Sequence, residues 1–285
     1  MIELIDYNPL AEIPTPCFVQ GMPNSAYHAS PGISKSGLDL INRSPAHYRY
    51  QASREATRAM DIGTAIHTSI LEPDRFQQEY LLLKDVKDRR ASEYKQAVKV
   101  HTSERVLISK EADNVAGMQE AVYAHARARE LLEAPGYCEL SAFYSDQRAR
   151  FDKLGWLSGT DEVFALDLKK TQDARPEEFA RSVARYRYHV QAAFYMDVYE
   201  NITGKPLDAF YFLAVEEQMP HAVAVYQLDA DAISIGRKEY QADLERYWEC
   251  VGNNEWPSYQ PESEYLALPG WLLAQYENDL EQEIT

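Results

Sequence analysis

Apolar side chains recur at helical spacing in the first half of the chain. Between residues 109 and 132 polar positions separate them, which predicts a helix with one buried face; the apolar residues are Val115, Met118, Val122 and Leu131. A mostly apolar segment at 62–71 is typical of a buried helix. Ser34 opens a short capped helix that ends before Pro45. We expect these helices to cover one face of a sheet.

The period changes in the middle of the chain. Partial alternation at 139–151 and a short apolar run at 163–168 predict two or three antiparallel strands, joined through the segment 155–159. Pro176 then opens a helix that should reach about Glu200, because proline and the acidic residues after it suit the first turn.

Two further strands are predicted at 209–214 and 222–228, followed by a final helix at 229–251. An order of strands, helix and strands is typical of an α/β fold. We find no repeat or convincing linker in the sequence, so we expect one domain.

The composition excludes several classes of protein. A chain of 285 residues with 45% hydrophobic residues can bury a full core, so disorder is not expected. We expect neither a secretory signal nor a membrane partner, because no charged and apolar leader is present and no apolar stretch reaches roughly 18 residues. The widely spaced Cys17, Cys138 and Cys250 predict no disulfide framework or zinc knuckle, and they suit a cytoplasmic location.

The charge distribution leaves two interpretations open. A net charge of -16 argues against a nucleic-acid partner, because DNA phosphates repel an acidic surface. However, basic residues outnumber acids over 84–110, arginines gather over 175–187, and much of the excess negative charge follows Glu262. These basic stretches either form a groove inside an acidic exterior or are ordinary solvated helix faces.

An acidic pair with a nearby lysine lies at the predicted strand ends. Asp152 ends one strand, and Asp167-Leu168-Lys169 lies at the end of the next. Strand alternation puts Asp167 and Lys169 on one face, while Leu168 points into the core and leaves its carbonyl available. Two carboxylates and a carbonyl form a partial shell for Mg²⁺, and the lysine can orient or deprotonate a water and stabilise phosphate charge. A salt-bridged strand surface is the alternative.

The helix after these strands adds polar groups. Gln191 and Tyr195 share a helical face, Tyr188 adjoins it, and Arg181 and Arg185 line a neighbouring stripe. We expect Gln191 to act with the catalytic groups and the other four side chains to bind substrate.

Several segments resemble the nuclease domain of the RecE (exonuclease VIII) family, in the family's order. They are residues 27–36, 63–73, 150–153, 167–169 and 186–195. Because that family belongs to the PD-(D/E)xK nuclease superfamily, the resemblance implies a mixed central sheet flanked by helices. The corresponding domain would span 27–272, with an N-terminal extension at 1–26 and an acidic tail at 273–285.

The resemblance also assigns roles to single residues. His67, which alone would be interpreted as a hydrogen-bonded core histidine, becomes a metal ligand with Asp152, Asp167 and the carbonyl of Leu168. Lys169 becomes the catalytic lysine.

Three departures from the family pattern bear on these assignments. Phe151 stands where proline is frequent, Lys170 replaces a small polar residue, and the stretch between the two aspartates is long. The last departure makes Asp161 a rival first carboxylate. We favour Asp152 because the residues around it match better.

What the resemblance implies is a 5′-to-3′ exonuclease acting on duplex DNA ends with Mg²⁺, for which Mn²⁺ is a possible substitute. It further implies a ring-shaped tetramer and a RecT-like single-strand annealing partner in recombination. The alternatives are a DNA-binding or assembly module that has lost cleavage, and a superfamily nuclease of another polarity or substrate. The sequence has no four-cysteine cluster, which disfavours the iron-sulfur members.

Overall fold

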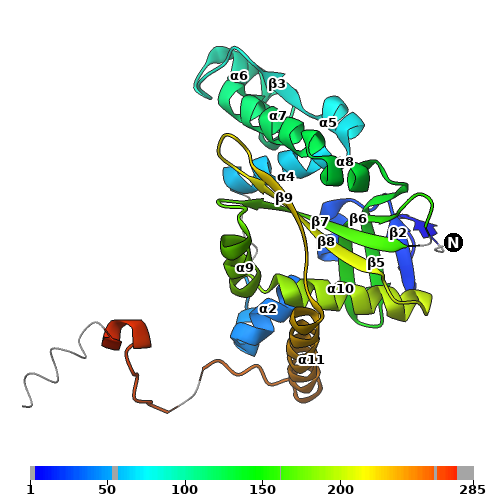
Figure 1. Ribbon diagram of the computed structural model, residues 1–285, viewed down its shortest axis with the longest axis vertical. Coiled ribbons are helices and arrows are strands. Elements are labelled where there is room, and N and C mark those ends of the chain that lie inside the picture. The colour runs from blue at the N-terminus through cyan, green and yellow to red at the C-terminus, as the bar shows by residue number, and fades with distance from the viewer. Residues whose placement is uncertain (1–3, 53–56, 161, 260–261, 275–285) are drawn as a thin grey trace, which may run out of the picture.

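The computed structural model describes residues 4–52, 57–160, 162–259 and 262–274. Its centre is a seven-stranded sheet in the order β1-β2-β5-β6-β7-β8-β9 (Figure 1). The pairs β1/β2 and β7/β8 are parallel, and the other neighbours are antiparallel. The strands are β1 (Leu4–Asp6), β2 (Cys17–Gln20), β5 (Gly136–Tyr144), β6 (Gln147–Trp156), β7 (Val163–Thr171), β8 (Ala209–Glu216) and β9 (Val223–Gln227).

Helices cover both faces of this sheet. They include α1 (Asn24–Ala29), α2 (Lys35–Arg43), α3 (Pro45–Arg49), α4 (Arg58–Leu71), α5 (Pro73–Glu79), α6 (Ser92–Ala97), α7 (Ser109–Ala124), α8 (Ala126–Glu133), α9 (Pro176–Arg185), α10 (Tyr188–Thr203) and α11 (Ala230–Asn253). A two-stranded parallel sheet of β3 (Leu81–Leu83) and β4 (Val106–Ile108), with a 3-10 turn at Ser103–Arg105, accompanies α7.

The sheet separates two hydrophobic cores. One core packs α2, α10 and α11 against the sheet, and the other packs α4, α5, α7 and α8 against the opposite face (Figure 1). The α/β prediction is therefore confirmed. The expectation that the first three helices share one face is wrong, because Leu38 and Ile41 of α2 contact the core opposite to that of α4 and α7.

The predicted helix at 109–132 is two helices in the structure. The chain leaves helical geometry at His125, whose Nδ1 accepts a hydrogen bond from the Ala128 amide at 3.2 Å and so caps α8.

The predicted helix from Pro176 to Glu200 also breaks in two. Arg187 adopts a left-handed backbone with φ 53° at the start of α10. Its half-buried guanidinium contacts Asp39, Glu239 and Asp243 at 3.1, 3.1 and 2.6 Å. These acids belong to α2 and α11, so contacts between distant helices hold the bend.

A close helix crossing fixes the beginning of α10. A Cβ on Gly236 of α11 would lie 2.2 Å from the His189 carbonyl oxygen, so only glycine fits there without displacing a helix.

The segment expected to be an N-terminal extension contributes β1 and β2 to the central sheet, and β2 pairs with β5. Most of the predicted acidic tail, residues 275–285, lies outside the described residues. No helix in the described part of the chain is long and apolar enough to cross a bilayer.

Candidate active site

The central strands β6 and β7 diverge at the predicted carboxylate pair. Their pairing runs from Trp156–Val163 to Lys153–Leu166 and stops there. One residue further, Asp152 Oδ2 accepts a hydrogen bond from the Leu168 amide at 2.8 Å, so a side chain replaces the next backbone contact. Asp152 thus lies inside β6, and its predicted position at a strand end is wrong.

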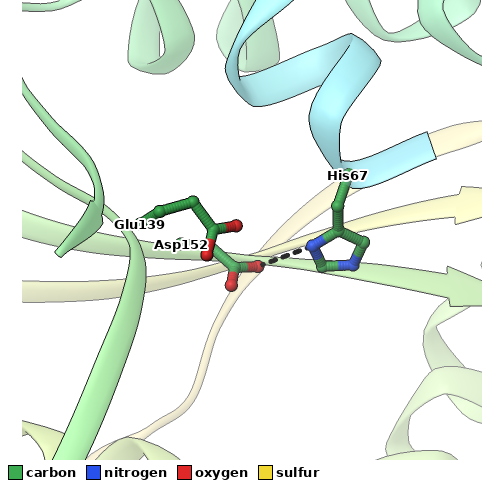
Figure 2. A group of neighbouring side chains, drawn as sticks. All are labelled: His67, Glu139 and Asp152. Atoms are coloured by element: carbon green, nitrogen blue, oxygen red, sulfur yellow. Dashed lines mark ion pairs between the residues drawn. The ribbon is translucent and has the colours of Figure 1, made fainter. Parts of the chain in front are cut away.

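Three potential metal ligands meet at this divergence. One ligand atom from each of His67, Glu139 and Asp152 lies within 4.8 Å of the other two. Figure 2 shows the imidazole descending from α4 toward carboxylates carried by β5 and β6. His67 Nδ1 lies 3.5 Å from Asp152 Oδ2.

Glu139 is absent from the residues predicted by sequence. It faces Asp152 because Cys138 pairs with Lys153 and Leu140 with Phe151 on the neighbouring strand. An isolated glutamate in an alternating strand carries no signal of its own, and only the register of β5 against β6 would have revealed it.

A second group of side chains surrounds Asp167. Lys169 Nζ lies 2.7 Å from Asp167 Oδ2 and donates to Gln191 Oε1 at 2.9 Å. The Gln191 amide nitrogen donates to Asp167 Oδ1. The ring of Tyr188 covers the ammonium, with 4.4 Å between Nζ and the ring centroid. Strand alternation places Asp167 and Lys169 together as expected, and Gln191 reaches them from α10, the second of the two helices into which the predicted helix divides.

The electrostatics of the site are those of crowded, buried carboxylates. Burial, followed by the charges of Asp167 and Glu139, raises the pKa of Asp152 well above its usual range. Burial also lowers the pKa of His67, which favours the neutral imidazole that a metal requires.

The pKa of Lys169 shifts in the direction that favours its charged form. Burial alone would lower its pKa, but the carboxylates of Asp167 and Asp152 outweigh burial and raise it. The charged ammonium is therefore favoured, which suits stabilisation of phosphate charge better than removal of a proton from water.

The donor set fits a divalent cation. Two carboxylates and a neutral imidazole lie together, the Leu168 amide bonds Asp152, and the charge of Asp167 acts on both His67 and Asp152. A cation would compensate the carboxylate repulsion that raises the Asp152 pKa. These residues would hold the ion, and Asp161, the rival first carboxylate, lies outside the described residues.

The predicted substrate-binding side chains Tyr195, Arg181 and Arg185 all have partners within the protein. Tyr195 is 9% exposed and packs edge-on against Phe151, with 5.1 Å between the ring centroids. It therefore supports β6 from within the core, where little of its side chain is exposed to a substrate. Arg181 pairs with Glu178, and Arg185 stacks on Tyr186, so both are engaged on the exposed side of α9.

Ion pairing occupies much of the two basic stretches. In the first, Arg89 pairs with Glu111, Arg90 with Asp88, and Arg105 with Glu79. In the second, Arg175 pairs with Asp173, and Arg187 is enclosed by three acids. For these arginines the interpretation as locally neutralised surface or structural groups is the better one.

Comparison with known proteins agrees with this architecture. Residues 34–269 match the model of a family described as a PDDEXK-like domain of unknown function (DUF3799). No curated protein matches the chain. A crystal structure described as that of a "putative exonuclease" from Eubacterium rectale aligns with a TM-score of 0.56 and 11% identity, over 90% of this chain and 99% of that chain.

A second solved structure, that of SSO0001, aligns over 75% of this chain and 90% of that chain at 11% identity, but its TM-score of 0.28 supports no conclusion. At 11% identity the first alignment shows a shared fold alone. The predicted PD-(D/E)xK core is confirmed by that fold and by the family match. The family model covers residues 34–269, which is most of the chain, and this chain therefore belongs to the PDDEXK-like domain family.

Proposed function

We propose that this protein is a Mg²⁺-dependent 5′-to-3′ exodeoxyribonuclease that resects linear double-stranded DNA. The observation that supports this most directly is the Asp167–Lys169–Gln191 group beside His67 and Asp152, in a PDDEXK-like domain. Acids for a cation next to a charged amine are what phosphodiester hydrolysis requires.

Each side chain of the site has its own role in the proposed reaction. His67, Asp152 and Asp167 hold divalent cations, which when bound supply an activated water and neutralise phosphate charge. Lys169 stabilises the negative charge that develops on the phosphate. Gln191 donates to the acid and accepts from the amine, so it fixes the separation between them.

The biological setting of the proposal rests on the resemblance to the RecE family. It comprises a ring-shaped homotetramer, entry of a duplex end, and transfer of the resulting single strand to a RecT-like annealing protein. The aligned Eubacterium rectale protein, described as a "putative exonuclease", agrees with the general activity.

One digestion experiment tests this function. Linear duplex DNA labelled at either the 5′ or the 3′ end, and circular DNA, are incubated with the protein in Mg²⁺ or in EDTA. We expect Mg²⁺-dependent loss of linear duplex, with immediate release of a 5′ label and spared circles. Asp167→Asn should abolish digestion, whereas Asp173→Asn, which changes a partly exposed acid beyond the end of the same strand, should not. Undiminished digestion by Asp167→Asn would refute the assignment.

A further inference from the structure

Glu139 occupies an unusual position in its strand. It has a left-handed backbone with φ 52°, which costs energy for a residue with a side chain. The β5/β6 pairing is interrupted at this point, between Cys138–Lys153 and Leu140–Phe151. The carboxylate thereby reaches the space shared by His67 and Asp152.

Arg150 holds that carboxylate in place. Its Nε donates to Glu139 Oε2 at 2.7 Å, and its Nη1 donates to the Met22 carbonyl at 3.0 Å and to Ser141 Oγ at 2.9 Å. The arginine side chain is only 10% exposed, so its orientation is fixed by these partners. Arg150 therefore restricts Glu139 to one direction.

The three ligands differ chemically from those around Asp167. An imidazole nitrogen belongs to the first set, and nitrogen ligands favour transition ions over Mg²⁺, which prefers oxygen ligands and water. The second position that the family resemblance implies, at Asp152, Asp167 and the Leu168 carbonyl, would offer oxygen atoms alone. Asp152 would be common to both positions.

We propose that Glu139, positioned by Arg150, completes a cation position with His67 and Asp152 that takes Mn²⁺ in preference to Mg²⁺, beside an all-oxygen position at Asp167. This rests on the metal dependence in the proposed function. Glu139 is thus a further metal ligand, and Arg150 is a positioning residue that acts through it.

Arg148 provides a matched control for Arg150. It lies two residues away on β6 and also covers the Tyr27 ring, at 5.2 Å against 5.6 Å for Arg150. It likewise bonds backbone carbonyls, those of Tyr27 and His28. Glu139 is not among the hydrogen-bond partners of Arg148, so the loss of Arg148 removes a comparable structural contact and leaves the ligand in place.

Mn²⁺ binding to metal-free protein, followed by electron paramagnetic resonance of the free ion, tests the proposal without any DNA. We expect two binding positions in wild type, of which one resists competition by Mg²⁺. Glu139→Gln and Arg150→Gln should each weaken the resistant position by about 10- to 100-fold. Arg150→Lys should recover part of the loss, and Arg148→Gln should match wild type.

Asp167→Asn should retain the Mg²⁺-resistant position and lose the other. Circular dichroism establishes which variants fold. If Arg150→Gln does not fold, Mn²⁺ binding by Glu139→Gln alone tests the proposal. Mn²⁺ binding by folded Glu139→Gln equal to that of wild type, or equal competition by Mg²⁺ at every position, overturns the proposal. DNA digestion by wild type would then still support the proposed function. Absence of all cation binding would contradict both this proposal and the proposed function.

Discussion

The metal-free site should destabilise the protein, and Asp152→Asn should relieve that cost. The Asp152 side chain is 15% exposed, and burial together with the nearby Asp167 and Glu139 carboxylates raises its pKa. Since the folded-state pKa exceeds the unfolded one, the wild type loses stability as pH rises from the unfolded value toward the folded value. Asparagine can still accept the Leu168 amide hydrogen bond.

The size of the expected stabilisation follows from the linkage between protonation of Asp152 and folding. Each unit by which the folded pKa exceeds the unfolded one costs about 1.4 kcal/mol at high pH. For a domain of this size about 1 kcal/mol corresponds to roughly 2–4 °C in melting temperature. A gain of at least about 3 °C is therefore expected for Asp152→Asn in EDTA near neutral pH, shrinking to nothing below about pH 4.

Thermal melting of both proteins, in EDTA and in Mg²⁺ across this pH range, measures the effect. Mg²⁺ should stabilise wild type increasingly as pH rises, because the cation binds ionised Asp152, and it should stabilise the variant much less. A variant that melts at or below the wild-type temperature in EDTA at neutral pH would contradict the idea that carboxylate repulsion dominates the site.

Three other changes test separate parts of the structure. Lys169→Met should reduce DNA cleavage by about 10²- to 10⁴-fold in a single-turnover assay yet keep Mg²⁺-induced thermal stabilisation; activity within a few fold of wild type would remove the lysine from the mechanism. Gly236→Ala should cost about 1–3 kcal/mol in urea unfolding, because its methyl group collides with the His189 carbonyl, and an unchanged midpoint would show that α10 and α11 separate freely. Arg187→Gln should cost about 3–5 kcal/mol at neutral pH by leaving Asp243 buried without its partner, and less in acid, where that carboxyl is protonated; an equal loss at both pH values would contradict this explanation.

The apolar spacing of the sequence located the helices and strands but not their breaks. The buried face of α7 follows the periodicity, since Met118 is fully buried as expected. The bend at Arg187, however, depends on acids from α2 and α11, 148 and 56 residues away. Local propensity contains no information on such contacts.

The candidate site was predictable where its residues are neighbours in a strand or helix. Alternation brings Asp167 and Lys169 together, and α10, the second helix after β7, carries Gln191 to them. For Tyr195, one turn further along α10, the shared helical face did not show that the side chain is buried in the core. Assigning His67 required resemblance, because it lies on a helix far from the carboxylates in sequence.

The imidazole and the carboxylates reach the site from different layers of the molecule. His67 belongs to α4, which covers one face of the sheet, whereas Glu139 and Asp152 belong to the sheet itself (Figure 2). An ion shared between them would hinder α4 from lifting off β6, so the binding free energy would add to the cost of that local opening. Amide hydrogens of α4 would then exchange more slowly in the presence of the ion, while those of α11, on the opposite side, would be less affected.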